Sequence, residues 1–259
     1  MLTIGISTVA SSLSELIIYI QDNIKKIDPS IDFLICSQRE SENVAIVISE
    51  RIKVLKTNES GLSRSRNTLL KENKNKWLWI QDDDIKIEFE ALQKLLETLS
   101  KSSDDLVFIK VKSLENKNEF YKNYTFHKTH RLTNSLKISS IEIVVRREFV
   151  NDKNIKFDTN LGLGTDLPCG EENKFVLNLF QSNAKVSYLD LATCFHTTEL
   201  EGREIDHKGR FSARGYLLRF YPFYISFPLM IRWAICIPAE LSFYRKIILM
   251  LRIYFKRQF

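Results

Sequence analysis

The sequence is poor in the residues that mark special classes of protein. Its four cysteines lie far apart in apolar or small-residue surroundings, without any C-x-x-C spacing: Cys36, Cys169, Cys194 and Cys236. Such cysteines are typical of reduced thiols in a cytosolic protein, so no disulfide framework is expected. With 8 glycines, 5 prolines and 44% hydrophobic residues, the chain of 259 residues has an ordinary globular composition.

The beginning of the sequence lacks the features of a targeting segment. Residues 1–20 carry no positive charge ahead of their apolar residues, and their pattern breaks into a strand-like part and a helix-like part. We therefore expect no signal peptide. Internal repeats and low-complexity segments are also absent. The length fits one large domain with its own core, with or without a small appendage.

Acidic residues are nearly absent from the last fifth of the chain. Residues 208–259 contain ten lysines and arginines against one acid, Glu240, a net charge of +9. The other 207 residues hold 28 basic and 31 acidic side chains, a net charge of −3. A mildly acidic body with a basic, aromatic-rich tail indicates an anionic surface as the partner of the tail. Nucleic acid is not expected as a partner, because the positive charge is confined to an apolar segment.

Strand-like and helix-like segments alternate along the body. Apolar stripes at helical spacing predict helices at residues 13–27, 62–72 and 89–99, and another that begins at about residue 171. Short apolar or β-branched runs predict strands at residues 2–7, 32–36, 52–55, 77–80, 106–111, 141–145 and 186–191. This rhythm predicts an α/β domain with a mostly parallel sheet, in which ligands bind at the carboxyl ends of the strands.

Three consecutive carboxylates, Asp82, Asp83 and Asp84, directly follow one of these predicted strands. Adjacent anions repel one another, so a fold that gathers them normally neutralises them with a divalent cation or with cationic side chains. Their hard oxygen ligands suit Mg²⁺ or Mn²⁺. The alternative is an acidic helix N-terminus, since carboxylates stabilise the positive end of the helix expected from Phe89.

Three sequence motifs occur in an order that resembles a known family. They are GLSRSRN at residues 61–67, QDDD at residues 81–84 and GEENKF at residues 170–175. This order is similar to that of the inverting family 2 glycosyltransferases of the GT-A fold, whose motifs are an A-R-N-like helix start, a D-x-D-type strand end and a G-E-D-x-x-F acidic pair. The resemblance covers roughly residues 2–198. It implies a nucleotide-sugar donor, with a UDP-sugar expected first, and Mn²⁺ or Mg²⁺ as the cofactor.

The resemblance also implies roles for individual residues. Asp83 matches the metal-binding position, Asp84 is the acid that follows it, and His196 stands after a strand where relatives place a histidine close to the metal or the phosphates. Asp82 matches the position near the ribose, and Arg66 would face the acidic strand ends or the diphosphate. Glu172 matches the catalytic base, with Glu171 beside it, although the choice between the two stays open.

Some positions depart from the family pattern around the nucleotide. Ser7 and Thr8 stand where many relatives begin a P-T-Y-N-like loop. Ser37 and Gln38 lie where relatives place an aspartate that holds the uracil ring, and either side chain could hydrogen-bond a base edge. Gln81 replaces the first acid of the commoner D-x-D form. The four residues Ser7, Thr8, Ser37 and Gln38 are nevertheless the expected donor contacts.

The tail has the pattern of a membrane-surface segment. Residues 221–238 are strongly apolar, but Pro222, Pro228 and Arg232 interrupt them, and they are short for a spanning helix of about 20 residues. After them, apolar and aromatic side chains between residues 244 and 255 form one helical face, and five basic residues including Lys246 flank it. This predicts an amphipathic helix on anionic lipid. The alternatives are a subdomain that packs on the body and an interface of a homo-oligomer.

These features together predict a GT-A domain at residues 1–206 and a membrane-associating helical tail at residues 207–259. The predicted function is metal-dependent, inverting sugar transfer to a hydroxyl of a glycan or lipid-linked acceptor, at the inner face of the cell membrane. One alternative is a nucleotidyltransferase, which would need a glycine-rich phosphate loop that residues 2–20 do not contain. The other is a non-catalytic membrane-surface scaffold with the same fold.

Overall fold

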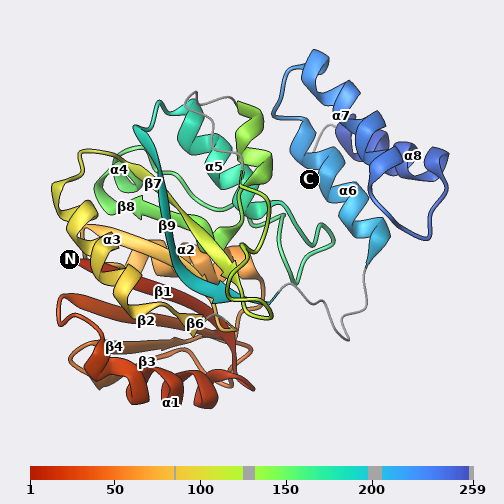
Figure 1. The fold of residues 1–259 in the computed structure, drawn as a ribbon. Helices are drawn as coiled ribbons and strands as arrows, with labels where there is room; N and C mark the ends of the chain where they lie inside the picture. The colour runs from red at the N-terminus through yellow and green to blue at the C-terminus, as the bar shows by residue number, and fades with distance from the viewer. Residues whose placement is uncertain (85, 125–131, 198–205, 257–259) are drawn as a thin grey trace.

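The computed structural model describes residues 1–84, 86–124, 132–197 and 206–256. A mixed sheet with helices on both of its faces forms the body, and three C-terminal helices lie together on one side of it (Figure 1). Among the described residues the sheet has nine strands in the order β3-β4-β2-β1-β5-β8-β7-β9-β6. Their bounds are β1 Leu2–Val9, β2 Ile31–Gln38, β3 Val44–Ser49, β4 Ile52–Lys56, β5 Trp77–Asp82, β6 Lys86–Ile87, β7 Leu106–Ser113, β8 Ile143–Arg146 and β9 Val186–His196.

Five helices cover the two faces of this sheet. They are α1 Leu13–Asn23, α2 Leu62–Glu72, α3 Phe89–Lys101, α4 Arg147–Asp152 and α5 Glu171–Gln181. The apolar stripes of α1 and α3 share one buried cluster, whereas those of α2, α4 and α5 share another. Strand β5 has apolar residues on both faces, because its two tryptophans belong to the first cluster while Leu78 and Ile80 belong to the second. Burial on both faces explains why this strand reads as a continuous apolar run.

The predicted α/β class with a central sheet between helices is confirmed, and the arrangement of the strands is more varied than expected. Strands β4, β2, β1 and β5 are parallel, as are β7 and β9, but four of the eight described pairings are antiparallel. Strand β8 runs antiparallel between β5 and β7. Two strands were not predicted: β3, which is an exposed edge strand, and β6, which has only two residues.

The C-terminal helices are α6 His207–Leu218, α7 Phe223–Cys236 and α8 Phe243–Tyr254. They have a core of their own, and α6 connects it to the body, where Ala213 and Tyr216 pack against Leu161 and Leu167. Gly215 allows α8 to cross α6 closely, since a Cβ atom there would lie 2.2 Å from the Met250 carbonyl oxygen. The segment therefore packs on the body as a subdomain, as one of the alternatives predicted.

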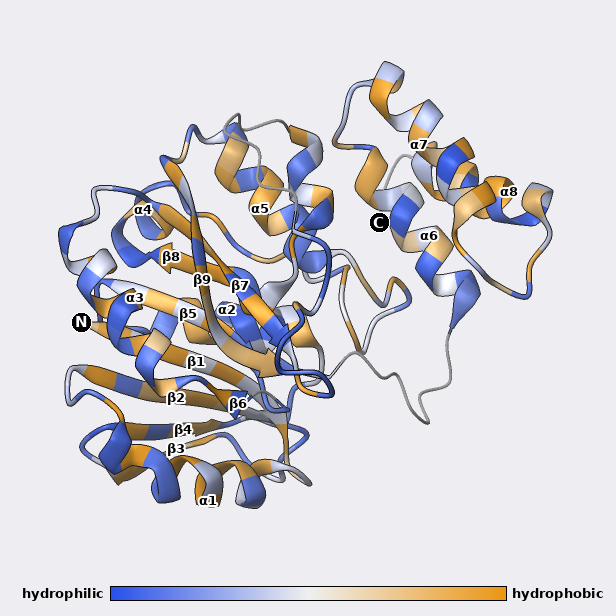
Figure 2. Cartoon of the chain, in the orientation of Figure 1, coloured by the Kyte–Doolittle hydropathy of each residue, from blue (hydrophilic) through white to orange (hydrophobic). Residues whose placement is uncertain are grey.

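The outer faces of α7 and α8 are apolar and exposed. Both helices show orange stretches in Figure 2, and their exposed apolar side chains are Phe223, Tyr224, Phe227, Ile231, Ile235, Phe243, Tyr244 and Ile248. We call these eight residues the α7–α8 apolar face. Among the described residues, no helix is both long enough and apolar enough to cross a bilayer.

Lys246 does not belong to the basic flank that the sequence predicts. It is buried, and its ammonium group donates hydrogen bonds to the carbonyl oxygens of Ala234, at 3.2 Å, and Ile237, at 2.8 Å. The side chain thus satisfies carbonyl groups at the C-terminal end of α7, where positive charge is favourable.

Candidate active site

The ends of β1, β2 and β5 bring the predicted donor contacts to one edge of the sheet. In the parallel register, Ser7 lies opposite Asp82 on β5, and Thr8 lies opposite Ser37 on β2. Gln38 follows at the end of β2. Because parallel strands present their carboxyl ends at the same edge, residues from three distant segments meet there.

Hydrogen bonds fix these side chains from behind. The Ser65 hydroxyl donates to the Ser7 hydroxyl over 2.9 Å, and the Gly61 amide donates to Gln38 Oε1 over 2.7 Å. Ser37 is fully buried and its hydroxyl donates to Glu40. Glu40 is thus an acid close to the position where relatives carry an aspartate. No sequence pattern pointed to Glu40, since it stands outside the motifs.

Asp83 and Asp84 lie in the turn after β5 and contact different partners. Thr8 donates a hydrogen bond to Asp83, and His196 Nε2 lies 3.2 Å from Asp84 Oδ1. Burial raises the pKa of Asp83, and the charges of Asp84 and Asp82 raise it further. Burial lowers the pKa of His196, but the Asp84 carboxylate outweighs it, so that the pKa of His196 is raised. His196 thus lies beside the acidic strand end, and its expected place close to a metal or to phosphates stays a prediction.

Arg66 connects the two acidic parts of the site. It lies on α2, is 1% exposed, and donates to Glu171 Oε1 over 2.7 Å and to Asp82 Oδ1 over 2.8 Å. Burial lowers the pKa of Arg66, but the two carboxylates outweigh it and the pKa is raised. A single cation therefore holds the end of β5 and the start of α5 together, and Arg64 on the same helix makes only an exposed contact with Glu59.

Glu171 and Glu172 begin α5, as the sequence predicts. Glu171 is buried against Arg66, and the space beside it is narrow because a Cβ atom on Gly162 would lie 3.3 Å from its carboxyl carbon. Glu172 is partly exposed and faces the hollows described next. Burial, with the neighbouring Glu171 charge adding to it, raises the pKa of Glu172 well above its usual value.

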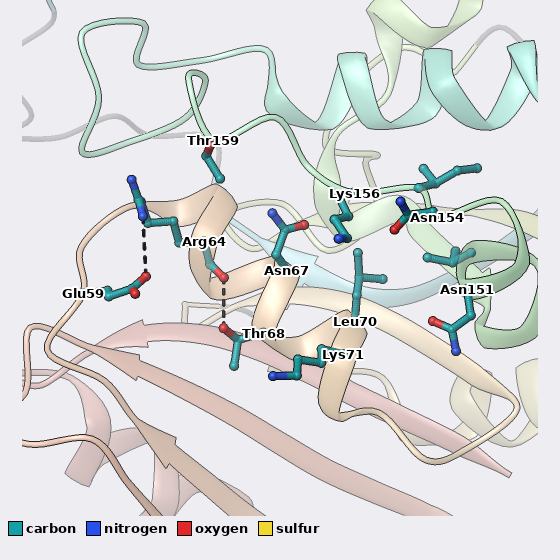
Figure 3. A pocket seen from close by; sticks show the side chains of 12 residues that line it. Glu59, Arg64, Asn67, Thr68, Leu70, Lys71, Asn151, Asn154, Lys156 and Thr159 are labelled. Carbon is teal, nitrogen blue, oxygen red and sulfur yellow. Dashed lines mark hydrogen bonds and ion pairs between the residues drawn. The ribbon is translucent and has the colours of Figure 1, made fainter.

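Two hollows meet at Glu172 and Asn173. One, of about 440 Å³, extends over residues 136–139 and reaches Tyr121 and Lys122, and the other, of about 230 Å³, extends toward α6 and α7. A larger hollow of about 630 Å³ lies beside α2, and Figure 3 shows its lining, with Asn67 and Leu70 on α2 and Asn151, Asn154 and Lys156 on the segment that follows β8. Neither the Asp82–Asp84 run nor the glutamate pair lines that larger hollow.

One family model matches part of the chain. Residues 36–159 match the model of glycosyl transferase family 2. The matched segment is a little under half of the chain, and it includes Arg66 and the three aspartates but not the glutamate pair. The search of curated proteins found no match to this sequence.

Solved glycosyltransferases share the fold at low sequence identity. S. aureus TarS 1–349 in complex with UDP-GlcNAc matches with a TM-score of 0.61 and 15% identity over 98% of this chain and 71% of that one. TarS itself matches with a TM-score of 0.59 and 14% identity over 97% of this chain and 42% of that one. The mannosyltransferase PcManGT from Pyrobaculum calidifontis, in complex with GDP-Man and Mn²⁺, matches with a TM-score of 0.55 and 13% identity over 96% and 70%.

The residues at the end of β5 fit a divalent cation that a substrate helps to hold. No three His, Cys, Asp or Glu side chains gather closely enough for a metal ion in the part of the chain that the structure describes. The pair of Asp84 and His196, with Asp83 next to it, offers oxygen and nitrogen donors that suit Mn²⁺. Such a cation usually completes its coordination with substrate phosphates.

Asp82, Asp83 and Asp84 do not lie at the N-terminus of the following helix, which was the alternative to a metal site. Helix α3 begins at Phe89 with Glu90 in its first turn, and β6 separates it from the aspartates. Gln81 is buried and donates to the Ile141 carbonyl oxygen over 2.9 Å, so it points into the sheet and away from the strand end.

Proposed function

We propose that this protein is a glycosyltransferase. It would move a sugar, with inversion, from a nucleotide-sugar donor to a hydroxyl of a glycan or lipid-linked acceptor. The observation that carries the proposal is the pair of hydrogen bonds from Arg66 to Asp82 and Glu171. It joins the strand ends expected to hold the donor to the helix start expected to face the acceptor. A UDP-sugar is the donor expected first, and the TarS complex with UDP-GlcNAc supports a nucleotide-sugar of this kind.

We assign the role of the base to Glu172, because Arg66 forms an ion pair with Glu171 and not with Glu172. In inverting transfer, an acceptor hydroxyl oxygen bonds to the anomeric carbon while the bond from that carbon to the diphosphate breaks, and a base takes the hydroxyl proton. Glu172 is partly exposed and its raised pKa makes it a stronger base than an ordinary carboxylate. Glu171 is engaged by Arg66, so we assign it the task of orienting the start of α5.

The donor side would use Ser7, Thr8, Ser37, Gln38 and Asp82, with Asp82 near the ribose. Glu40, held by Ser37, is a further acid on that side. Mn²⁺ or Mg²⁺ would be held by Asp83, Asp84 and His196, and when bound it offsets the charge of the departing diphosphate. The Mn²⁺ in the PcManGT complex supports a divalent cation in this fold.

We further propose that the protein lies on the inner face of the cell membrane. The α7–α8 apolar face carries exposed arginines at its flank, Arg232, Arg245 and Arg252, and the segment from residue 208 onward has a single acid. An exposed apolar face with a basic flank matches the chemistry of an anionic lipid surface.

A donor screen tests the transfer function. Purified protein would be given a set of nucleotide-sugars with Mn²⁺, and sugar release and thermal stabilisation would be measured for each. We expect one donor, a UDP-sugar first, to be hydrolysed slowly and to raise Tm. Asp190→Asn is a suitable control variant, because Asp190 is an exposed aspartate outside the three motifs. If no nucleotide-sugar binds, the proposed function is wrong.

A further inference from the structure

The smaller hollow at Glu172 has an unusual combination of linings. We call it the α6–α7 cavity. Glu172 supplies a carboxyl group, Arg214 of α6 supplies a positive charge, and Ala213, Leu217, Trp233 and Ile237 supply apolar surface. The cavity thus places the proposed base, one cation and an apolar wall around a single space of about 230 Å³.

Arg214 is held in place without a carboxylate partner. Its guanidinium lies 5.4 Å from the centre of the Phe211 ring and 5.8 Å from that of Trp233, and Nη1 donates to the Arg210 carbonyl oxygen over 3.2 Å. No described Asp or Glu lies within 4.0 Å of its nitrogens. Arg210 lies one turn earlier on the same helix, and burial lowers the pKa of Arg214, to which that second cation contributes. A half-buried arginine in this position favours an anion from outside the chain.

The other hollow at Glu172 lacks this property. Its Lys122 is 2.6 Å from the buried carboxylate of Glu142, which also accepts a hydrogen bond from Tyr124. That cation is therefore neutralised within the protein, and Lys137 beside it is exposed. Of the two hollows lined by Glu172, the α6–α7 cavity is therefore the better site for an anionic ligand, because Arg214 has no carboxylate partner among the described residues.

Resting on the proposed function, we propose that the α6–α7 cavity binds the acceptor, and that this acceptor is a sugar joined through a phosphate to an apolar chain. The phosphate would pair with the Arg214 guanidinium, which can bind it with two hydrogen bonds. The apolar chain would lie on Leu217, Trp233 and Ile237. A hydroxyl of the sugar would then reach Glu172, and the chain would leave beside α7, whose outer side belongs to the α7–α8 apolar face.

The protein carries its own reporter for this cavity. Of its three tryptophans, Trp77 and Trp79 are 1% and 0% exposed, whereas Trp233 lines the cavity and is partly exposed. Quenching of tryptophan fluorescence by acrylamide therefore reports mainly on Trp233. The probe is decyl phosphate below its micelle concentration, with decyl glucoside and inorganic phosphate as the comparisons that carry only the chain or only the phosphate.

We expect decyl phosphate to protect Trp233 saturably, and both comparison compounds to do so far more weakly. Arg214→Gln should weaken the apparent Kd for decyl phosphate roughly tenfold or more, the worth of a charge-assisted hydrogen bond to phosphate. Arg147→Gln, an exposed change on α4, should leave it unaltered. Equal affinity in Arg214→Gln and in the unmodified protein would overturn the proposal.

The unmodified protein alone also decides the matter if Arg214→Gln does not fold. Equal protection by decyl phosphate and decyl glucoside would mean an apolar surface only, and equal protection by inorganic phosphate would mean an anion site only; either result overturns the proposal. UDP binding, measured by calorimetry on the same protein, distinguishes failure of the acceptor proposal from failure of the proposed function. UDP binding without decyl phosphate binding refutes the acceptor class alone, whereas failure of UDP and of every nucleotide-sugar refutes the proposed function.

Discussion

Arg66 donates a hydrogen bond of 2.7 Å to Glu171, which is 105 positions later in the sequence. The other end of the same guanidinium binds Asp82. One buried cation is thus shared between two carboxylates from different parts of the chain. Removing it would leave two acids facing each other without a counter-charge, which makes this residue the most sensitive point of the site.

Arg66→Gln should therefore destabilise the protein strongly. We expect a loss of about 3–5 kcal/mol in the free energy of unfolding, as when one partner of a buried ion pair is removed. Arg64→Gln is the matched control on the same helix, and because Arg64 is exposed its effect should be at most about 1 kcal/mol. Urea unfolding of both variants measures the difference, and similar values for the two would show that the buried contacts contribute nothing special.

Glu172→Gln should make the protein more stable and less active. The folded protein raises the pKa of Glu172 above its unfolded value, so ionisation at neutral pH costs stability, and this cost disappears below the unfolded pKa. The amide mimics the protonated form. We expect a higher Tm than that of the unmodified protein at pH 7.5 and little difference at pH 4, while transfer falls by roughly two to four orders of magnitude. A lower Tm at pH 7.5 would contradict the assignment.

The pH dependence of transfer should reflect the same group. A base acts when deprotonated, so the rate should fall as the pH is lowered through the raised pKa of Glu172, well above the pH of about 4.3 at which an ordinary glutamate titrates. The profile of kcat/KM against pH measures this with the donor found by the screen. If kcat/KM stays unchanged down to the pH at which an ordinary glutamate titrates, another group is the base.

Asp83→Asn should abolish metal-dependent binding of the nucleotide. An amide is a poor ligand for a hard cation and cannot supply the negative charge that Mn²⁺ needs. Calorimetry with UDP, in the presence and absence of Mn²⁺, should show that the metal strengthens binding to the unmodified protein and to Asp190→Asn but not to Asp83→Asn. Undiminished Mn²⁺-dependent affinity in a folded Asp83→Asn protein would remove the metal role from this residue.

The α7–α8 apolar face should bind anionic liposomes. Replacing Tyr224 and Ile235 together by serine should weaken binding roughly tenfold or more, because two exposed apolar side chains lose their contact with lipid. The control is Ile18→Ser, which should have no effect. Ile18 is 57% exposed, and its helix α1 lies on the side of the body away from α7 and α8 (Figure 1). Co-sedimentation with liposomes at low and high salt measures both, and binding to anionic lipid should weaken with salt.

Unchanged liposome binding in the Tyr224 and Ile235 double variant would favour an interface between copies of the chain. Analytical ultracentrifugation then distinguishes a dimer from a monomer. Truncation within α6 is a poor test, since Gly215 lies where α8 crosses α6 and the cut would expose the core of the subdomain.

The sequence pattern located the acidic motifs of the site on their strand and helix. The partners of Glu40, Lys246 and β8 depend on tertiary contacts and could not be predicted from it. The aspartates could be placed at a strand end and the glutamates at a helix start because each signal lies within a few residues. The role of Glu40 could not be predicted, since it depends on how the chain returns after β2. Lys246 was misplaced because helical spacing locates the α-carbon, whereas its long side chain reaches back to α7. The antiparallel place of β8 likewise depends on pairing between distant strands.

The chain order of the site has a consequence for how the protein is made. A chain extended only as far as Asp84 already contains β1, β2, β4, β5 and Arg66, to which we assign the donor side. Glu171 and Glu172 come almost ninety residues later, and closing so long a loop is slow relative to local structure formation. The proposed donor half is therefore synthesised well before the proposed base, and on this assignment the site is complete only when α5 docks against Arg66, which we expect late in folding.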